Sequence, residues 1–446
     1  MKKFKTTLAF ALALILCAVS ALPAFAAVRA EILPAWIVPS GYNAHDYGKC
    51  AAFFEITDGN GLKNGNRMSD GYDPSDPSTW ISIDMFGDIF EHVIWEEHDG
   101  ELRLKRIDVA YLDAVGTLDL SGCPYLTYIE ATDDCLDAIN THNCPELREL
   151  YCDNNGLGTI DVSENPLLYK LWCDGNGLTE IDISNNPALY TLDCNNNLLT
   201  SLDLSNHPAL GELYCADNLL TELDVSENTE LTWLWCPGNM LTELDVSANT
   251  KLRKVFAADN ALTEINLGDN TLLNLLDCMN NRIASLDVSA NTALKELDGA
   301  GNTFTYLKLN SLLGLDTVRA EGDGSFSYHY SVPYSEGFLS ASANEGSVFV
   351  GWYDENGEFI TASPYITIWN TAYTELTARF TTSSPVLLGD ADGSGYVNMA
   401  DAVLTLRYAM GLIDASGINL INADVNNDGG VNMADAVAIL RAAMGL

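Results

Sequence analysis

The sequence predicts a β-rich solenoid with a parallel sheet and an N-terminal cap, followed by a small β module and a short all-α domain. Two observations lead to this fold class. One 21-residue unit is repeated nine times without interruption over residues 126–314, and near the C-terminus two acidic loops each lead into an amphipathic helix. Because a fixed repeat period indicates stacked structural units, the chain is organised around these repeats.

The first residues have the pattern of a secretory signal peptide. Three lysines among the first five residues precede an apolar run, and Ala24-Phe25-Ala26 is a small-x-small cleavage site. No later apolar run approaches the length needed to cross a membrane. We therefore expect a secreted, extracellular protein without membrane insertion. The expected domains are 1–26 signal peptide, 27–104 N-terminal cap, 105–314 repeats, 315–383 small β module and 384–446 C-terminal domain.

The charge balance argues against two classes of partner. Acidic residues number 62 against 22 basic residues, which gives a net charge of −40. A chain of this charge is repelled by nucleic-acid phosphates and by anionic membrane surfaces. We expect neither as a partner.

Residues 27–104 do not repeat, and their number suits a cap over the end of a solenoid core. Residues 43–56 are compatible with a short helix that has Phe53 and Phe54 on its apolar side. A loop is expected over 57–79, and residues 102–109 alternate like a strand. Residues 105–125 form a degenerate repeat.

Each position of the repeat has a predictable role. Leucine or a similar residue fills positions 1, 4, 11 and 14, and Cys is usual at position 6. Positions 4 and 6 alternate with polar or aromatic neighbours and predict one strand, while 14 and 16 predict a second, shorter strand. Asn at positions 9 and 19 is expected to satisfy backbone groups at two corners. Asp134 replaces Asn once at position 9, and His207 replaces it once at position 19.

The pattern LxxLxCxxNxLTxLDVSxNxx resembles the leucine-rich repeat in a short, 21-residue form, over residues 126–314. The resemblance implies a right-handed, curved leucine-rich-repeat solenoid with a parallel sheet on its inner face. It does not imply any one ligand.

Six of the eleven cysteines occupy position 6 and are expected to face inward. Parallel side chains in one column seldom meet disulfide geometry, so we interpret these cysteines as buried thiols that fill space. A bridge between Cys123 and Cys144 is left open, as is the redox state of Cys50 and Cys135.

Position 5 is expected to point outward from the main sheet and to carry a recognition surface. Aromatic rings on an exposed sheet face are typical of protein recognition, and flat rings also stack on sugars. A protein or peptide ligand is favoured, and a polysaccharide or a purely scaffolding role is left open. The residues of this face are Tyr151, Trp172, Tyr214, Trp235 and Phe256 at position 5 and Trp233 at position 3. The acidic column at position 15 is interpreted as solvated corner carboxylates, with lateral cation binding as the alternative.

Residues 315–383 read as a small β module. Residues 325–332 alternate, and Asp354-Glu355-Asn356-Gly357 is a turn between two strands. The GWY motif at 351–353, followed by a turn and a closing LTARF, resembles the small β-repeat modules found beside leucine-rich repeats in bacterial surface proteins. A spacer or a C-terminal cap is the role we expect.

Two twelve-residue loops, DADGSGYVNMAD at 390–401 and DVNNDGGVNMAD at 424–435, predict calcium binding. Oxygen side chains fall at loop positions 1, 3, 5, 9 and 12, with Gly at 6 for the sharp turn, which suits the six to eight oxygens that Ca²⁺ prefers. The ligands expected for two ions are Asp390, Asp392, Ser394, the Tyr396 carbonyl, Asn398 and Asp401, and in the second loop Asp424, Asn426, Asp428, the Gly430 carbonyl, Asn432 and Asp435.

Asp instead of Glu at loop position 12, the lack of an entering helix and the near-identity of the two copies resemble the type I dockerin. The resemblance implies an all-α domain that binds a cohesin module on a scaffolding protein. It also implies cohesin contacts at Met399, Ala400, Leu406, Arg407, Met433, Ala434, Leu440 and Arg441. Because both copies carry the same residues, two binding orientations are expected.

No catalytic motif appears: the six histidines are scattered, and there is no HExxH, GxSxG or P-loop pattern. The sequence therefore predicts a non-catalytic subunit of a cellulosome-like complex at the cell surface, held through a scaffolding protein. The first alternative is a carbohydrate-binding accessory subunit. An enzyme that degrades polysaccharides ranks below it, since dockerins usually accompany such enzymes but residues 27–104 are too few for a hydrolase fold.

Overall fold

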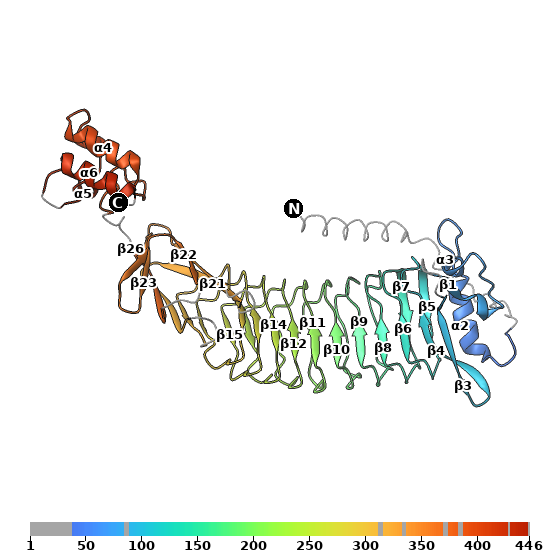
Figure 1. The fold of residues 1–446 in the computed structure, drawn as a ribbon. Helices are drawn as coiled ribbons and strands as arrows, with labels where there is room; N and C mark the ends of the chain where they lie inside the picture. The colour runs from blue at the N-terminus through green and yellow to red at the C-terminus, as the bar shows by residue number, and fades with distance from the viewer. Residues whose placement is uncertain are drawn as a thin grey trace. The chain divides into compact units, whose positions relative to one another are not determined.

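The computed structural model describes residues 38–83, 89–310, 315–331, 336–368, 373–381, 387–426 and 429–444. They belong to two compact units, which we treat separately (Figure 1). The first comprises residues up to Thr317 with Ser327–Phe338 and Thr367–Ala372, and the second Val318–Phe326, Leu339–Ile366 and Tyr373–Leu446. The expected signal peptide at 1–26 lies outside the described residues. No helix of the described chain is both long and apolar enough to span a membrane.

The cap begins with the expected helix, because the Asn43 side chain accepts the N–H groups of His45 and Asp46 and so starts α2. Phe53 and Phe54 are buried, as expected. The predicted loop at 57–79 was partly wrong: it contains α3 and a 3₁₀ turn that Asp76 caps through Ser78 N–H. The cap elements are α2 Ala44–Phe54, α3 Asn64–Met68, η1 Pro77–Thr79, β1 Ile81–Ile83, β2 Ile89–Glu91, β3 Val93–His98 and β4 Glu101–Asp108.

The cap is joined to the first repeat by polar contacts as well as by its core. The Asn64 side chain donates to the carbonyls of Phe53 and Val115 and accepts Val115 N–H at 3.0 Å. Asp46, fully buried, accepts two bonds from Arg103 and one from Leu104 N–H. A buried carboxylate needs such partners, and they fix α2 against β4.

The repeats stack as a parallel sheet in which each strand pairs with the strand one repeat away (Figure 1). Leu150, Leu171 and Leu192 pair in register and are fully buried, so position 4 is the core face that the sequence predicts. The strands occupy positions 3 to 5, and are β6 Tyr128–Glu130, β8 Glu149–Tyr151, β9 Lys170–Trp172, β10 Thr191–Asp193, β11 Glu212–Tyr214, β12 Trp233–Trp235, β14 Lys254–Phe256, β16 Leu275–Asp277 and β18 Glu296–Asp298.

The predicted second strand is present in only some of the described repeats. It covers positions 13 to 15 from the repeat that starts at 231 onward, and it is longer in β5 Val115–Asp119 and β7 Cys135–Asn140. It is absent in repeats that start at 147 to 210. The Asp at position 15 accepts the N–H of the Ser two residues later, as at Asp161 and Ser163, and this ends the extended stretch. These bonds also agree with the reading of the acidic column as corner carboxylates. The shorter strands are β13 Glu243–Asp245, β15 Glu264–Asn266, β17 Ser285–Asp287 and β19 Tyr306–Lys308.

Both Asn columns satisfy buried backbone groups, as predicted. The Asn218 side chain donates to the Cys194 and Cys215 carbonyls and accepts Leu199 N–H at 3.0 Å. At the other corner, His207 takes the place of Asn by pointing Nε2 at the Ile183 carbonyl, 3.0 Å away. Each Asn at position 9 thus bonds to its own repeat and to the previous one, and each Asn at position 19 bonds to the previous one. These side chains are the rungs of two ladders that couple neighbouring repeats along the array.

Asp134 occupies an Asn rung but cannot donate as an amide does. Its Oδ1 accepts Leu112 N–H and Ala114 N–H, while its buried Oδ2 has no hydrogen-bond partner among the described residues. Burial raises the pKa of this carboxyl to about 7. Asparagine at this position is neutral and donates to backbone carbonyls, whereas Asp134 becomes neutral only by taking up a proton and leaves Oδ2 unpaired within the described chain.

Asp134→Asn is expected to stabilise the fold most above neutral pH. Because the native pKa lies above the unfolded value near 3.8, stability falls as pH rises from about 4 to about 7. The amide removes this slope and should gain about 1–2 kcal/mol at pH 8. Urea unfolding at pH 5 and pH 8 measures the difference; Asp137→Asn, at an exposed neighbour, is the control. An equal gain at both pH values would contradict the assigned proton.

The six cysteines at position 6 are buried and free, as predicted, and Cys123 and Cys144 are free as well. Cys152, Cys173 and Cys194 each donate from Sγ to the carbonyl of the outward residue one repeat on, at 3.2–3.4 Å. The column is therefore a ladder of buried thiols.

The last repeat is closed by an antiparallel strand. Residues 329–331 of β21 Gly324–Ser331 pair with β18, so that Leu297 faces Tyr330 and Asp298 faces His329. His329 Nδ1 lies 3.2 Å from an Asp298 oxygen, and this contact raises the pKa of His329. Pairing removes the open edge of the parallel sheet.

The second unit contains the rest of the β module and the C-terminal domain. β23 pairs antiparallel with β24 and β26, and Gly357 N–H donates to the Asp354 carbonyl in the predicted turn. Its elements are β20 Thr317–Glu321, β22 Glu336–Ala343, β23 Val348–Asp354, β24 Phe359–Thr361, β25 Tyr365–Ile368, β26 Glu375–Thr381, α4 Met399–Ala409, η2 Ala415–Gly417, α5 Leu420–Ala423 and α6 Met433–Ala443, some of which extend into the first unit.

Candidate functional site

Each C-terminal acidic loop is bound to the first turn of the helix that follows it. Asn398 accepts Ala400 N–H while Asp401 accepts Asn398 N–H at 2.8 Å, which is a capping box at the start of α4. Asn432 and Asp435 make the same pair of bonds at α6. The loop sequence thus sets both the start of each helix and the position of its last carboxylate.

The first loop gathers three carboxylates. Asp390, Asp392 and Asp401 each offer an oxygen, and these oxygens lie within 4.8 Å of one another. Asp390 and Asp401 are buried, and the loop's own N–H groups hold them: Ser394 and Gly395 donate to Asp390, and Asp392 donates to Asp401. A donor set made only of oxygen, with buried negative charges this close, fits Ca²⁺.

The second loop is built in the same way where the structure describes it. Gly429 N–H donates to Asp424 at 2.9 Å, and Val425 and Asn426 N–H groups donate to the buried Asp435. Gly395 and Gly429 have φ of 87° and 86°, which favours glycine at loop position 6. Asp428, an expected ligand, lies outside the described residues.

The aromatic side chains of the repeats form one column on the outward side of the parallel sheet. Tyr151, Trp172, Asp193, Tyr214, Trp235 and Phe256 pair in register from strand to strand. Trp172 is 39% exposed, and the other rings of this face are half-buried. Their outward position is the one that the sequence predicts.

The column divides into two aromatic groups. Tyr151 and Trp172 meet edge to face at 5.1 Å between ring centroids, and Trp235 packs on Phe256 at 4.3 Å. Trp233, from position 3, lies 6.0 Å from Phe256 and has Lys254 Nζ 4.3 Å from its ring centre. Rings packed in this way give a firm apolar surface with a cation–π contact at its side.

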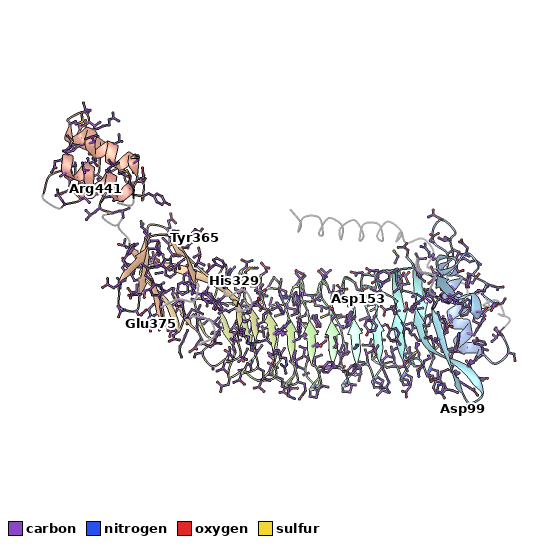
Figure 2. All side chains as sticks on the ribbon, in the orientation of Figure 1. Asp99, Asp153, His329, Tyr365, Glu375 and Arg441 are labelled. Carbon is purple, nitrogen blue, oxygen red and sulfur yellow. The ribbon has the colours of Figure 1, made fainter. Side chains whose placement is uncertain are left out.

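Asp193 lies between the two aromatic groups in the column, and Asp153 and Asp174 follow Tyr151 and Trp172 at position 7. The sequence did not predict that these carboxyls interact. Burial and the neighbouring Asp174 raise the pKa of Asp153 to about 8, and burial raises the pKa of Asp193 to about 6. Asp174 N–H donates to the Asp153 side chain at 3.1 Å; Figure 2 labels Asp153 among the side chains of the repeats. The signal in the sequence was the run of acids at positions 5 and 7, but only the packing shows that Asp153 is buried and that Asp174 and Asp193 are half-buried.

A family comparison identifies the C-terminal domain. The model of the dockerin type I domain matches residues 388–442. Residues 388–442 are a type I dockerin domain. Such domains bind calcium and dock to cohesin modules, so Ca²⁺ and a cohesin partner are indicated for this chain.

Comparison with solved structures found several similar chains. The functional domain of InlJ from Listeria monocytogenes, which includes a cysteine ladder, is 20% identical, with 58% of this chain and 76% of that chain covered and a TM-score of 0.40. YopM from Yersinia enterocolitica is 26% identical, with 44% of this chain and 45% of that chain covered and a TM-score of 0.37. The internalin InlF from Listeria monocytogenes is 16% identical, with 47% of this chain and 86% of that chain covered and a TM-score of 0.30. None of the curated proteins compared with the chain matches it. The pairing of its own strands makes the repeat region a parallel β-solenoid, and its repeat sequence is of the leucine-rich-repeat type.

The dockerin presents the predicted cohesin contacts on its two equivalent helices. Met399 and Met433 are 56% and 57% exposed. Ala400, Ala434, Arg407 and Arg441 are exposed, while Leu406 and Leu440 are half-buried. Behind them the domain core contains Ala391, Ile418 and Ala423. The two helices thus expose apolar side chains together with one arginine each.

Four exposed residues of the same helices were missed from the sequence. Val403 and Val437 are about half exposed, as are Met410 and Met444. They follow Met399 and Met433 at four and eleven residues, which is the spacing of one helical face. Helical periodicity applied to MADAVLTLRYAM would have found them.

A second cluster of potential metal ligands lies in the cap. His45, Asp46 and Cys123 have ligand atoms within 4.8 Å of one another. However, Asp46 already accepts Arg103 and Leu104 N–H, and His45 Nε2 lies 2.9 Å from the Ser121 carbonyl. These contacts explain the cluster as a structural junction between α2 and the first repeat.

Proposed function

We propose that this chain is a secreted, non-catalytic subunit that docks onto a scaffolding protein through calcium-dependent dockerin–cohesin binding and presents its repeats for protein recognition. The observation that carries the proposal is the dockerin domain, with two acidic loops closed onto two equivalent helices. A cell-surface, cellulosome-like complex is the setting that fits such a domain.

Two calcium ions are proposed, one for each loop, with the ligands expected from the sequence: Asp390, Asp392, Ser394, Tyr396, Asn398 and Asp401, then Asp424, Asn426, Asp428, Gly430, Asn432 and Asp435. A bound cation supplies positive charge to carboxylates that would otherwise repel one another. The chain's own residues do the rest: Asp401 and Asp435 hold the loop N–H groups and the helix starts in place. Fixed loops keep the docking helices in one geometry.

The proposed cohesin face comprises the expected contacts Met399, Ala400, Leu406 and Arg407, with Val403 on α4 and Met410 directly after it added from the structure, and their counterparts 34 residues later on and after α6. Apolar side chains at the centre with arginines at the edge are the usual composition of a binding site. Because the two helices carry nearly the same residues, either can lead, and two orientations on one cohesin are expected.

The proposal is tested by capture of partners from culture supernatant on the immobilised mature chain, with Ca²⁺ or with EDTA. Capture of a protein with several cohesin modules is expected with Ca²⁺, and not with EDTA or with Asp390→Ala plus Asp424→Ala. Asp414→Ala is the matched control. Asp414 lies in the same domain outside both loops, where its side chain accepts Ser416 N–H at the start of η2. If no partner depends on calcium, the loops only stabilise a C-terminal domain and the docking proposal is wrong.

For the repeat face we propose a protein ligand on Tyr151, Trp172, Tyr214, Trp233, Trp235 and Phe256. Half-buried, mutually packed rings offer a firm apolar surface at low entropic cost, which suits binding of another protein. The exposed Trp172 favours a polysaccharide as the second candidate, since its ring has free surface for a sugar. The Asp153–Asp174 pair keeps a polysaccharide-degrading enzyme as a third candidate, because burial raises the pKa of both carboxyls and paired carboxyls can act as acid and base.

Trp172→Ala with Trp235→Ala separates these candidates. For a protein ligand, the double variant should lose the partner retained in EDTA by at least about tenfold in affinity, because buried aromatic anchors carry most of the binding energy. Migration on polysaccharide affinity gels should stay unchanged. Tyr365→Ala, at an exposed ring in the β module, is the control. Retardation on such gels that the double variant abolishes would instead favour the carbohydrate-binding subunit.

A further inference from the structure

A groove of about 910 Å³ crosses four repeats on the side of the solenoid that carries β13 and β15. Its floor is formed by the nearly buried Leu223, Leu244 and Ile265, and carboxylates stand beside them. β13 and β15 pair in register, so Glu243 lies beside Glu264. The acids form two columns at the spacing of the strands, about 4.8 Å: Glu222, Glu243 and Glu264, and Asp203, Asp224 and Asp245.

The negative charge of this groove is not balanced by the repeats. Its lining contains no Lys, Arg or His. Ion pairs elsewhere on the described repeats, such as Lys251 with Glu230 and Lys308 with Asp287, do not include the three glutamates. The Ser two residues after each aspartate donates to it and lowers its pKa, so that column is ionised at neutral pH.

Like charges at this spacing repel each other by about 0.2–1 kcal/mol per neighbouring pair. An exposed sheet face with such columns therefore gains from a partner that brings positive charge. Electrostatic attraction alone would suit any cation. Exposed apolar residues near the groove favour one class of positively charged partner over the others.

Three exposed apolar residues, which we call the ridge, each precede the groove by a short stretch of chain. Leu198, Leu219 and Met240 are 50%, 41% and 47% exposed in three successive repeats. Each lies three residues before a groove residue, such as Leu219 before Glu222, and three residues reach at most about 10 Å. The same position is Gly156 or Gly177 in earlier repeats and Arg282 later, so the ridge and the groove occupy the same part of the array.

We propose that this groove and ridge bind a basic, amphipathic polypeptide segment. Its Lys or Arg side chains pair with the two carboxylate columns, and its apolar side chains pack on Leu198, Leu219 and Met240. A small cation leaves the ridge unexplained, and a second copy of this chain, with a net charge of −40, brings repulsion instead of complementarity. The surface is separate from the aromatic face and from the dockerin, so the chain has a third binding region.

The test uses the full mature chain and a labelled short peptide of alternating Lys and Leu, with binding followed by fluorescence anisotropy. Glu222→Gln with Glu243→Gln and Glu264→Gln is expected to weaken binding at least about tenfold, because three charge-assisted contacts are lost. Glu97→Gln with Glu345→Gln and Glu358→Gln changes the net charge equally at exposed sites outside the groove, and should weaken binding less than about twofold. Circular dichroism checks that both variants are folded. Equal weakening by both would mean attraction by net charge alone and would overturn the proposal.

A second arm tests the ridge. Leu219→Ser with Met240→Ser should weaken the Lys–Leu peptide at least about fivefold and leave a lysine-only peptide unchanged, because only the former has apolar side chains to pack. No effect on either peptide would overturn the amphipathic part of the proposal. Calorimetric binding of Ca²⁺ beyond the two ions proposed for the dockerin, lost in the groove variant while peptide binding is unaffected, would assign the groove to a cation and overturn the proposal entirely.

Discussion

Replacing both Asp401 and Asp435 by Ala is expected to abolish the calcium-dependent folding of the dockerin. Each carboxylate is fully buried and binds N–H groups of its loop and of its helix cap: Asp401 accepts Asp392 and Asn398, at 3.0 and 2.8 Å. Alanine leaves these buried donors unpaired, at about 1–3 kcal/mol each, and removes a ligand from each proposed site.

Calorimetric melting with Ca²⁺ and with EDTA measures this effect. A ligand at about 100 times its Kd stabilises the folded state by about 2.7 kcal/mol, so the parent dockerin transition should shift upward with Ca²⁺. The double variant should show no shift, and Asp414→Ala should keep the shift of the parent. Asp401→Ala alone should halve the calcium stoichiometry in a titration. A full calcium shift in the double variant would contradict the assigned ligands.

The repeat fold was predictable from the sequence because each of its positions has one environment. Leu171 and Leu192 are buried and Trp172 is outward for the same reason, namely the two-residue alternation of a strand. The Asn rungs were predictable because a corner exposes backbone groups that a side-chain amide can bind. The loops 390–401 and 424–435 were predictable because oxygen ligands at fixed spacing have few other uses.

Other features depend on packing that one sequence position does not encode. The second strand forms at Glu243–Asp245 but not in the repeat of Asp161, although both carry Asp at position 15. The pKa of Asp153 is raised because the neighbouring repeats bury it beside Asp174. The groove likewise arises from residues of four repeats, each of which looks ordinary alone. A prediction from periodicity gives every repeat the same structure. The second strand, the buried Asp153 and the groove are found in only some repeats, because the neighbours of those repeats differ.

Asn186→Ala is expected to destabilise the solenoid by about 2–3 kcal/mol, because it removes two hydrogen bonds in a fully buried corner. Asn186 Nδ2 donates to the Val162 carbonyl of the previous repeat and to the Asn165 carbonyl, both at 2.9 Å. Asn185, the next residue in the chain, is exposed, and Asn185→Ala should change the stability by less than about 0.5 kcal/mol. Urea unfolding followed by circular dichroism compares the two variants.

The same substitution tests whether the ladder couples the repeats. In a stacked array, each repeat is stabilised mainly through its interfaces with its neighbours, so weakening one rung lowers the cost of opening the array at that point. Hydrogen exchange should therefore accelerate most in the repeats around Asn165 and Asn186 and little at the distant Leu276 strand. Uniform acceleration along the array would mean that the solenoid opens only as a whole. Localised acceleration would mean that the rungs limit how far a disturbance on one repeat, such as a ligand bound at Trp172, is transmitted toward the other end.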